Sequence, residues 1–290
     1  MLVAQPDSDP QFEHLTRRVQ NGSVELHCEE YRQENFQASA PMLLLSEAEA
    51  PSSRWPDELL TALVEQYGRV IWFDTRDTGR SSWPLDPYSM GDLAGDVLAV
   101  LDAHGVGTAH LFGRSMGGQV AQAVALTAPE RVASMVLMST TPGRREELGL
   151  PEEWLIEKMS ERFLQEPPGD PTGRAEWIVD QLEWFAGPAF AFDRDERLAA
   201  VAEESANYWR GPNAHGVAVI EAPDILDELA QLTMPVTIIH GTADPVLPVA
   251  HATALHDAIP GSTLHLIEGL GHDIPAAVVP QILRLLSRLA

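Results

Sequence analysis

The sequence predicts an α/β fold in which a mostly parallel sheet is flanked by helices. Along most of the 290 residues, short apolar segments of the length of buried strands alternate with longer segments of helical periodicity. The alternation stops between residues 142 and 221, where the pattern is helical. Hydrophobic residues make up 44% of the chain, which is enough for a large core. We therefore expect one sheet with a helical segment inserted into it.

The first elements follow from turn signals and apolar segments. Asn21 and Gly22 form a strong hairpin signal between two strands, and Pro56 lies early in the helix that follows, where proline is tolerated. Residues 1–15 are expected to be a mobile tail. Strands are predicted at residues 17–20, 24–31, 41–45 and 69–73, with a helix at 56–66.

The later elements continue the alternation of strands and helices. In the first of these helices, Leu93, Val97, Leu98 and Leu101 have the spacing of one buried face. Helices are predicted at residues 91–104, 119–128, 247–259 and 275–289, and strands at residues 108–112, 132–138, 235–240 and 262–267.

The stretch Gly-Arg-Ser-Met-Gly at residues 113–117 carries the strongest functional signal. A buried strand is predicted before it and a helix after it, and this setting is that of a nucleophile elbow. So sharp a turn strains the backbone of Ser115, and Gly113 and Gly117 leave room for the strand and helix that cross there. Met116 begins the helix, where the dipole favours negative charge. We predict that Ser115 is a catalytic nucleophile and that Met116 supplies one oxyanion N–H.

A serine nucleophile needs a base, and the base needs an acid that orients it. Asp244 and His272 each follow a predicted buried strand, and side chains at the carboxyl ends of parallel strands converge. The order Ser, Asp, His is the one that nucleophile elbows use. Asp273 adjoins His272, but neighbours on an extended loop point apart, so we expect it to matter less. We predict a triad of Ser115, Asp244 and His272.

The helical segment at residues 142–221 is interpreted as a cap, and residues 1–141 and 222–290 as the core domain. Aromatic residues are concentrated in the cap. Most are expected to form the cap's own core and some to face a pocket, since ligand sites are largely apolar and aromatic. A bulky hydrophobic substrate fits this pattern, although the segment is equally able to close over a small one. The candidates for substrate contact are Trp154, Trp184, Phe185, Tyr208 and Trp209.

Four segments carry a resemblance to a known family: WPDE at 55–58, DTRDTGRS at 74–81, SMG at 115–117 and GLGH at 269–272. With them the chain resembles the α/β-hydrolase superfamily over nearly its whole length, and within it the anthracycline (aclacinomycin) methylesterase group. The resemblance implies an α/β-hydrolase fold with a mostly parallel eight-stranded sheet and a helical cap. The DTRDTGRS stretch also occurs in esterases, lactonases, proline peptidases and C–C hydrolases. Within it we interpret Asp74, Arg76 and Asp77 as a structural ion-pair turn.

The loop after the strand at residues 41–45 departs from that family. Relatives usually carry a His-Gly or Gly-Gly-like turn there, whereas this chain has SEAEAPSS. The second oxyanion N–H is expected from Ser46 or Glu47, but a glutamate carboxylate that points inward repels an oxyanion. Two interpretations stay open. Either Glu47 and Glu49 point to solvent, or the site is remodelled and no longer performs ordinary acyl transfer.

The composition of the chain limits the kinds of molecule that it is expected to bind. Asp and Glu number 43 against 19 Lys and Arg, a net charge of −24 that disfavours nucleic acid and anionic membranes as partners. No apolar run is long enough to span a membrane, and no secretory signal is visible. The single cysteine, Cys28, excludes an internal disulfide and favours a cytoplasmic location. No metal or dinucleotide motif is present, so no cofactor is predicted. A homodimer stays open.

The sequence thus predicts a bacterial serine hydrolase that acts on a small hydrophobic molecule. By resemblance, the substrate is a methyl ester on a natural-product scaffold such as a polyketide, which suggests antibiotic biosynthesis. Lactone or C–C bond hydrolysis by the same fold is the first alternative. A non-hydrolytic cyclase or lyase that uses His272 for proton transfer is the second. A ligand-binding protein with an inactive site is disfavoured by the complete triad.

Overall fold

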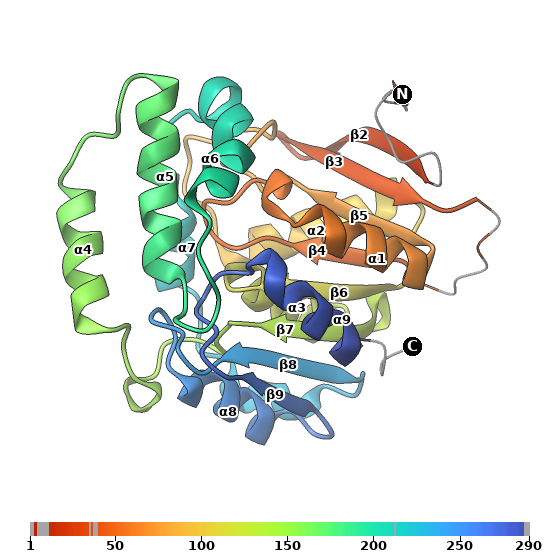
Figure 1. Cartoon of the computed structure of the whole chain (residues 1–290). Helices are drawn as coiled ribbons and strands as arrows, with labels where there is room; N and C mark the ends of the chain where they lie inside the picture. The colour runs from red at the N-terminus through yellow and green to blue at the C-terminus, as the bar shows by residue number, and fades with distance from the viewer. Residues whose placement is uncertain (1–2, 5–11, 35, 37–39, 212, 287–290) are drawn as a thin grey trace.

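A single twisted sheet forms the centre of the protein in the computed structural model, which describes residues 3–4, 12–34, 36, 40–211 and 213–286 (Figure 1). Within these residues the sheet has nine strands in the order β1-β2-β3-β5-β4-β6-β7-β8-β9. The strands are β1 (Val3–Ala4), β2 (Glu13–Asn21), β3 (Val24–Arg32), β4 (Met42–Leu45), β5 (Arg69–Phe73), β6 (Ala109–Arg114), β7 (Val132–Met138), β8 (Val236–Gly241) and β9 (Thr263–Ile267).

The pairing of the strands confirms the predicted α/β class and corrects one detail. From β5 to β9 all neighbours are parallel, and β1, β2, β3 and β5 pair antiparallel. The strand β1 is additional to the eight predicted, because Val3 pairs with Thr16 and Ala4 with Leu15. The prediction of a tail at residues 1–15 is wrong for these two residues and for 13–15, which form the start of β2. Residues 5–11 lie outside the described part of the chain.

Two apolar layers cover the two faces of the sheet. Within β4, Leu43 and Leu45 belong to one buried cluster, and Met42 and Leu44 belong to the other, as the alternation of side chains along a strand requires. Helices α2 (Met90–Ala103), α3 (Met116–Thr127) and α8 (Val249–Ala258) pack on the first face, and α1 (Asp57–Tyr67) and α9 (Val279–Leu286) on the second. Burial on both faces explains why the parallel strands read as continuous apolar runs.

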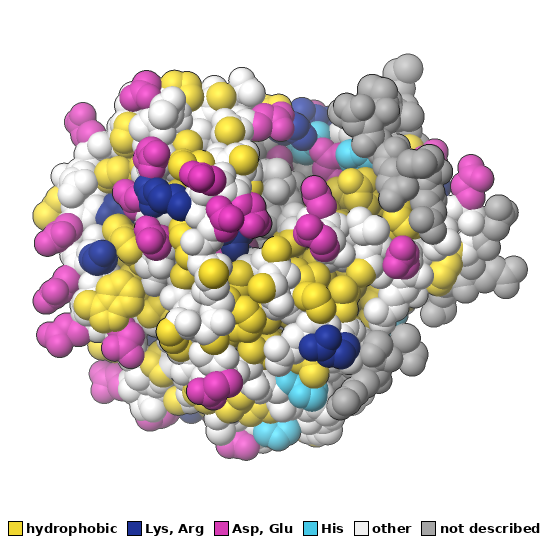
Figure 2. Space-filling view, viewed as in Figure 1, with side chains coloured by type: hydrophobic (Ala, Val, Ile, Leu, Met, Phe, Trp, Pro, Cys, Tyr) yellow, Lys and Arg dark blue, Asp and Glu magenta, His cyan; other side chains and the backbone are white. Residues whose placement is uncertain are grey.

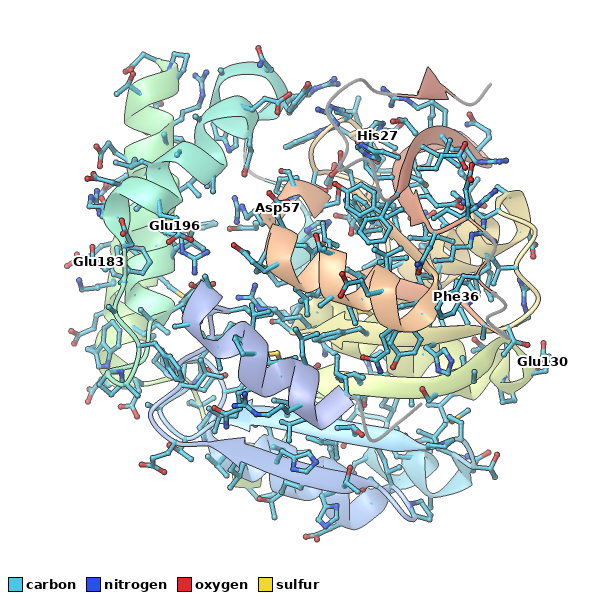
Figure 3. The ribbon with its side chains drawn as sticks, turned by 45° about the vertical axis from the view of Figure 1, so that its right-hand side comes forward. His27, Phe36, Asp57, Glu130, Glu183 and Glu196 are labelled. Atoms are coloured by element: carbon cyan, nitrogen blue, oxygen red, sulfur yellow. The ribbon has the colours of Figure 1, made fainter. Side chains whose placement is uncertain are left out.

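The chain between β7 and β8 is helical in its described part, and we call residues 142–221 the insertion. Its helices are α4 (Glu153–Phe163), α5 (Pro171–Phe185), α6 (Arg194–Glu203), the π-helical turn η4 (Glu204–Tyr208) and α7 (His215–Ile220). Figure 1 shows α4, α5 and α6 beyond the ends of the parallel strands at which their arrows point. In Figure 3, Glu183 and Glu196 mark this side, and Glu130, just before β7, lies at the opposite end.

The insertion has a small aliphatic core of its own. Its members are Ala175, Ile178, Val179, Leu182 and Val201, with Phe192 and Leu198 packed against them. The expectation that most of the cap's aromatic residues form its core is therefore wrong, although Phe192 does pack on that core. Aromatic side chains there stack on cations instead. Trp177 lies 3.8 Å from the Arg162 guanidinium carbon, and Trp209 lies 5.5 Å from that of Arg174.

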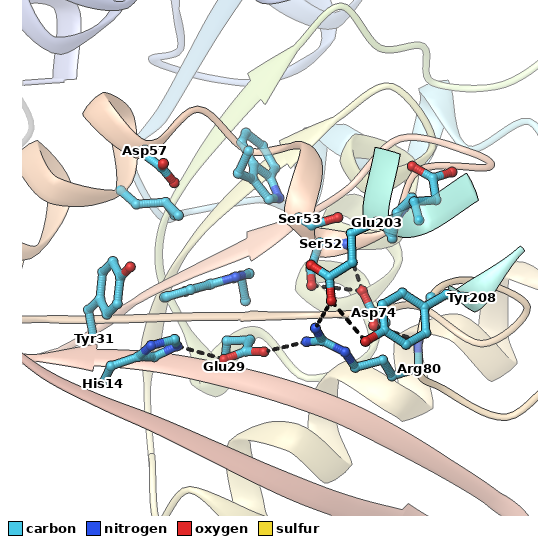
Figure 4. A pocket seen from close by; sticks show the side chains of 16 residues that line it. His14, Glu29, Tyr31, Ser52, Ser53, Asp57, Asp74, Arg80, Glu203 and Tyr208 are labelled. Atoms are coloured by element: carbon cyan, nitrogen blue, oxygen red, sulfur yellow. Dashed lines mark hydrogen bonds and ion pairs between the residues drawn. The ribbon is translucent and has the colours of Figure 1, made fainter. Parts of the chain in front are cut away.

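Arg80 and Arg54 fasten the insertion to the core. Arg80 contacts Glu29 on β3 at 3.0 Å and Glu203 on α6 at 3.0 Å, and its guanidinium carbon lies 4.6 Å from the ring centre of Tyr208 (Figure 4). Arg54 pairs with the buried Glu204 at 2.6 Å. The residues that line the pocket in Figure 4 include Arg80, its three partners, Glu204, Tyr31, Trp55 and Trp72. Because none of the predicted triad residues lines it, we assign it to the junction and not to the chemistry.

The surface carries many acidic side chains, as the net charge of −24 requires. Acidic side chains are spread across the face in Figure 2, most densely over the insertion, with basic side chains between them. Among the described residues, no helix combines the length and the apolar character that a bilayer crossing requires.

Candidate active site

Ser115 occupies a strained turn between β6 and α3. Its backbone angles are φ 51° and ψ −119°, a region that residues other than glycine rarely adopt. The turn is held by hydrogen bonds from Ser115 N to the Met138 carbonyl, 2.9 Å, and from Thr140 Oγ1 to the Ser115 carbonyl, 2.6 Å. A Cβ on Gly117 would lie 2.0 Å from the Leu45 carbonyl oxygen. The predicted strain at Ser115 and the need for small residues beside it are confirmed.

The structure brings Ser115, Asp244 and His272 together. His272 Nε2 lies 3.0 Å from Ser115 Oγ, and His272 Nδ1 lies 2.7 Å from Asp244 Oδ2. A carboxylate accepts hydrogen bonds only, so His272 carries its proton on Nδ1 and presents a lone pair at Nε2 to the serine hydroxyl. Asp244 and His272 are 7% and 4% exposed, which protects this alignment from competing water. The arrangement can withdraw a proton from Ser115.

Asp244 is held as a carboxylate by its surroundings. Burial alone would raise the pKa of Asp244, but the charge and hydrogen bond of His272 outweigh burial and lower it. The second carboxylate oxygen accepts hydrogen bonds from Val246 N and Leu247 N, both 2.9 Å. His240 lies nearby, and burial lowers its pKa, so it is neutral at pH 7 and does not compete for the acid. Asp244 is thus free to orient His272.

The neighbouring acid, Asp273, faces different partners. It contacts Arg197 of α6, and its other oxygen lies 3.5 Å from Arg114 Nη2. Adjacent side chains on this loop therefore point apart, as expected for neighbours on an extended loop. The geometry favours Asp244 over Asp273 as the acid that orients His272.

The insertion supports the loop that carries His272, residues 268–273, which we call the histidine loop. The His272 N–H donates to the carbonyl of Phe185 at 2.8 Å, and Ala189 N donates to the Gly269 carbonyl at 3.1 Å. A Cβ on Gly271 would lie 2.1 Å from the Phe185 carbonyl oxygen, so only glycine permits this approach. The Phe185 ring centre is 5.8 Å from that of His272, edge to face. The end of α5 and the histidine loop therefore form one packed unit.

Of the aromatic residues predicted to contact substrate, the structure places Phe185 beside the triad. Trp184 and Tyr208 stack on cations, with Lys158 Nζ 5.1 Å from the Trp184 ring centre and Arg80 over Tyr208. Trp154 lies on α4 and is 42% exposed. Trp209 stacks on Arg174, as described above. Their assignment as substrate contacts stays a prediction, with Phe185 the best placed of the five.

The loop that follows β4 lies against the start of α3, and we call its residues 46–49 the oxyanion loop. Ser46 is buried, and its Oγ accepts a hydrogen bond from Trp55 Nε1 at 3.0 Å. A Cβ added to Gly117 would lie 2.8 Å from the Ser46 carbonyl oxygen, so this loop and the start of α3 are in contact. The N–H of Met116, at the first helical position, has no partner within its helix by geometry. This proximity is what an oxyanion hole from Met116 and Ser46 or Glu47 requires.

The two acidic residues of this loop behave differently. Glu49 is exposed and accepts a hydrogen bond from Gln181 Nε2 at 3.3 Å, as the solvent-facing interpretation predicts. Glu47 does not point to open solvent, because its carboxylate accepts from Arg114 Nη1 at 2.8 Å and its side chain is 14% exposed. Neither interpretation of Glu47 anticipated this pairing, in which a neighbouring cation compensates its charge.

The turn at residues 74–81 has the structural role expected from the sequence, but the partners of its charged residues lie elsewhere in the chain. Arg76 pairs with Asp96 of α2 at 2.7 Å instead of with a neighbour in the turn. Asp77 Oδ2 accepts from the Tyr88 hydroxyl at 2.9 Å. Asp74 Oδ1 accepts from Ser52 N and Oγ at 2.8 and 2.7 Å. The turn therefore anchors the segment that follows the oxyanion loop.

Comparisons with known proteins identify the family. The family model described as alpha/beta hydrolase fold matches residues 46–275. Rhodomycin D methylesterase DauP of Streptomyces sp. (strain C5) is 35% identical over 83% of this chain and 87% of its own length. Rhodomycin D methylesterase DnrP of Streptomyces peucetius is 33% identical over 91% and 94%. The solved structure of Est816, titled as an N-acyl homoserine lactone degrading enzyme, superposes with a TM-score of 0.73 at 25% identity, covering 94% of this chain and 100% of Est816.

Proposed function

The chain belongs to the α/β-hydrolase family and is a carboxylic ester hydrolase, and we propose that it cleaves a methyl ester of a hydrophobic natural-product substrate through an acyl-enzyme on Ser115. The alignment of Ser115 Oγ, His272 and Asp244 is the observation that carries the proposal. The likeness to two rhodomycin D methylesterases supports the choice of a methyl ester.

The proposed reaction has two acyl-transfer steps. Ser115 Oγ attacks the ester carbonyl carbon while His272 Nε2 takes the hydroxyl proton, and the resulting oxyanion is stabilised by the N–H of Met116 with that of Ser46 or Glu47. His272 returns the proton to the departing methoxy oxygen, so methanol leaves and Ser115 keeps the acyl group. Water, deprotonated by His272, then attacks this ester, and His272 returns the proton to Ser115 Oγ as the carboxylic acid is released. Asp244 holds the imidazole in the required tautomer throughout.

The substrate class and the setting belong to the same proposal. Phe185 beside His272 offers an apolar contact for a bulky acyl group. Relatives from Streptomyces that act on rhodomycin D support a role in antibiotic biosynthesis. A cytoplasmic location is supported by the free and buried Cys28.

Two measurements test the proposal. The purified protein is incubated with rhodomycin D, with an N-acyl homoserine lactone and with an aryl acetate, and the products are identified by mass spectrometry. We expect the methyl ester to be the best substrate, with methanol and the free acid as products. In parallel, a fluorophosphonate probe should add one phosphonyl group to the wild type and none to Ser115→Ala. A faster lactone reaction would change the substrate class, whereas labelling of Ser115→Ala would refute the acyl-enzyme.

A further inference from the structure

Arg114, the residue before the nucleophile, joins three parts of the site. It is the last residue of β6, and its side chain is 5% exposed. Its Nη1 donates to Glu47 Oε1 at 2.8 Å, in the loop that follows β4. Its Nη2 donates to the backbone carbonyl of His272 at 2.9 Å. One guanidinium thus bonds the loop of the oxyanion donors and the loop of the base, while its own backbone belongs to the elbow.

The bonds of Arg114 fix backbone positions as well as side chains. A planar guanidinium with donors in a fixed fork sets the direction of each partner, which a flexible ammonium group does not. The bond to the His272 carbonyl restrains the main chain from which the imidazole extends. The bond to Glu47 restrains the residue whose own N–H, or that of Ser46, is proposed to contact the oxyanion. Because Arg114 directly precedes Ser115, both restraints tie these loops to the backbone of the nucleophile.

The charges around Arg114 are balanced. A buried cation needs a partner, because a charge that is left alone in the interior is costly. Glu47 supplies one carboxylate and Asp273 a second, whose other oxygen contacts Arg197 on α6 of the insertion. The Glu47 carboxylate is therefore compensated where it lies, and its repulsion of a developing oxyanion is reduced by the cation beside it. This explains how an acidic residue is compatible with the loop.

We propose that Arg114 is a positioning residue that keeps the oxyanion loop and the histidine loop in register with Ser115, with Glu47 as its required counterion. The inference rests on the proposed acyl-enzyme function. It assigns Glu47 to the support of the oxyanion hole instead of to acid–base chemistry. It also predicts that loss of Arg114 lowers the rate of the chemical step more than the affinity for substrate.

The test compares substitutions of Arg114 and Glu47 with a matched control. Arg114→Met should lower kcat about 10²-fold with KM changed less than about threefold, since a displaced oxyanion donor costs this much. Arg114→Lys keeps the charge but not the fork, and should recover about tenfold of the loss. The control is Arg69→Met, which breaks the buried pair with Glu30 at the start of β5, away from the triad, and should leave kcat within about twofold.

A double-substitution cycle decides whether Glu47 acts through Arg114. Glu47→Met alone should lower kcat about tenfold, and adding it to Arg114→Met should cost little more, because both remove the same restraint. Equal effects on kcat in Arg114→Met and Arg69→Met, or additive losses in the cycle, would overturn the inference. If Arg114→Met does not fold, Arg114→Lys takes its place in the cycle with Glu47→Met, and additive losses of kcat would again overturn the inference. The proposed function is tested separately: it requires that the wild type turns over the ester and that Ser115→Ala does not. If that holds and the Arg114 results fail, only the present inference is refuted.

Discussion

Asp244 Oδ2 lies 2.7 Å from His272 Nδ1, and the two residues come from loops that follow different parallel strands. The next residue along the chain, Asp273, is engaged by Arg197 and lies 3.5 Å from Arg114 Nη2. Of these two acids, Asp244 contacts the imidazole of His272, whereas Asp273 contacts arginines. The geometry favours Asp244 as the acid that orients the ring, and Asp273 links the loop of His272 to Arg114 and to Arg197.

Replacement of the two acids should separate these roles. Asp244→Asn should lower kcat about 10⁴-fold, because the amide no longer selects the tautomer that accepts the serine proton. Asp273→Asn should lower it less than about tenfold, since the amide keeps a hydrogen-bonding oxygen for the arginines. Steady-state kinetics of both variants on one ester provide the comparison. A larger loss in Asp273→Asn would reverse the assignment of the acid.

Removal of the nucleophile should abolish turnover without unfolding the protein. Ser115→Ala is expected to lower ester hydrolysis by several orders of magnitude, as loss of a triad nucleophile does. The strained φ of 51° at this position is unfavourable for alanine as for serine, so stability should change little. Circular dichroism and thermal unfolding check the fold. Turnover near the wild-type rate in a folded variant would contradict covalent catalysis by Ser115.

Two adjacent aromatic residues allow a matched test of substrate contact. Phe185→Ala should raise KM for a bulky ester about tenfold and affect a small acetate less, because a lost apolar contact costs about 1–3 kcal/mol. Trp184 is also a candidate for substrate contact, but it stacks on Lys158 and Arg162 of the insertion, and the comparison therefore tests which of the two contacts the substrate. Trp184→Ala should leave KM for both esters within about twofold. The ratio of KM values for the two esters is the quantity to compare, and equal ratios in the two variants would exclude a specific role of Phe185.

Acid stability should depend on Glu30, which lies on β3 with its side chain 1% exposed. Burial alone would raise the pKa of Glu30, but hydrogen bonds from His104 and Arg69 and the charge of Arg69 lower it to about 2. A carboxyl whose pKa falls on folding stabilises the protein above its unfolded pKa of about 4.3, and the stabilisation is lost as the pH falls toward about 2. Glu30→Gln should therefore lower the free energy of unfolding by about 3 kcal/mol at pH 7, with a smaller difference near pH 2.

Urea unfolding at several pH values between 7 and 2 measures this difference. The control is Glu25→Gln on the same strand, where the pair with Arg18 has side chains 50% and 48% exposed at 3.4 Å. That substitution should change the free energy of unfolding by less than about 1 kcal/mol at every pH. A Glu30→Gln difference that does not shrink in acid would mean that packing, and not the charge, is lost.

The fold and the proximity of Ser115, Asp244 and His272 were predictable because their signals are local. Apolar runs of strand length, helical periodicity and the glycines around Ser115 each depend on a few consecutive residues, and the structure reproduces the elements that they indicate. Asp244 and His272 were identified because both follow buried parallel strands, whose ends must converge. The same reasoning identified neither the ninth strand, which is two residues long, nor the start of β2 at Glu13.

The supporting contacts were not predictable because they join distant residues. Glu47 and Arg114 are 67 positions apart, and no local pattern says that one carboxylate meets that guanidinium. The same holds for Arg76, which pairs with Asp96, 20 positions away on another element. A signal did exist for Arg114. An arginine inside a buried elbow must find a counterion, and the unexpected glutamate in the facing loop was the available candidate.

The hydrogen bond from His272 N to the carbonyl of Phe185 has a consequence for chimeric enzymes. A donor segment grafted between β7 and β8 would bring its own carbonyl in place of that of Phe185, and so would shift the main chain that carries His272. Grafts that end before α5 begins at Pro171 would leave this bond and the packing of Gly271 intact. Helix α4, in which Leu155 is the buried residue, is the part of the insertion most readily exchanged without retuning the chemistry.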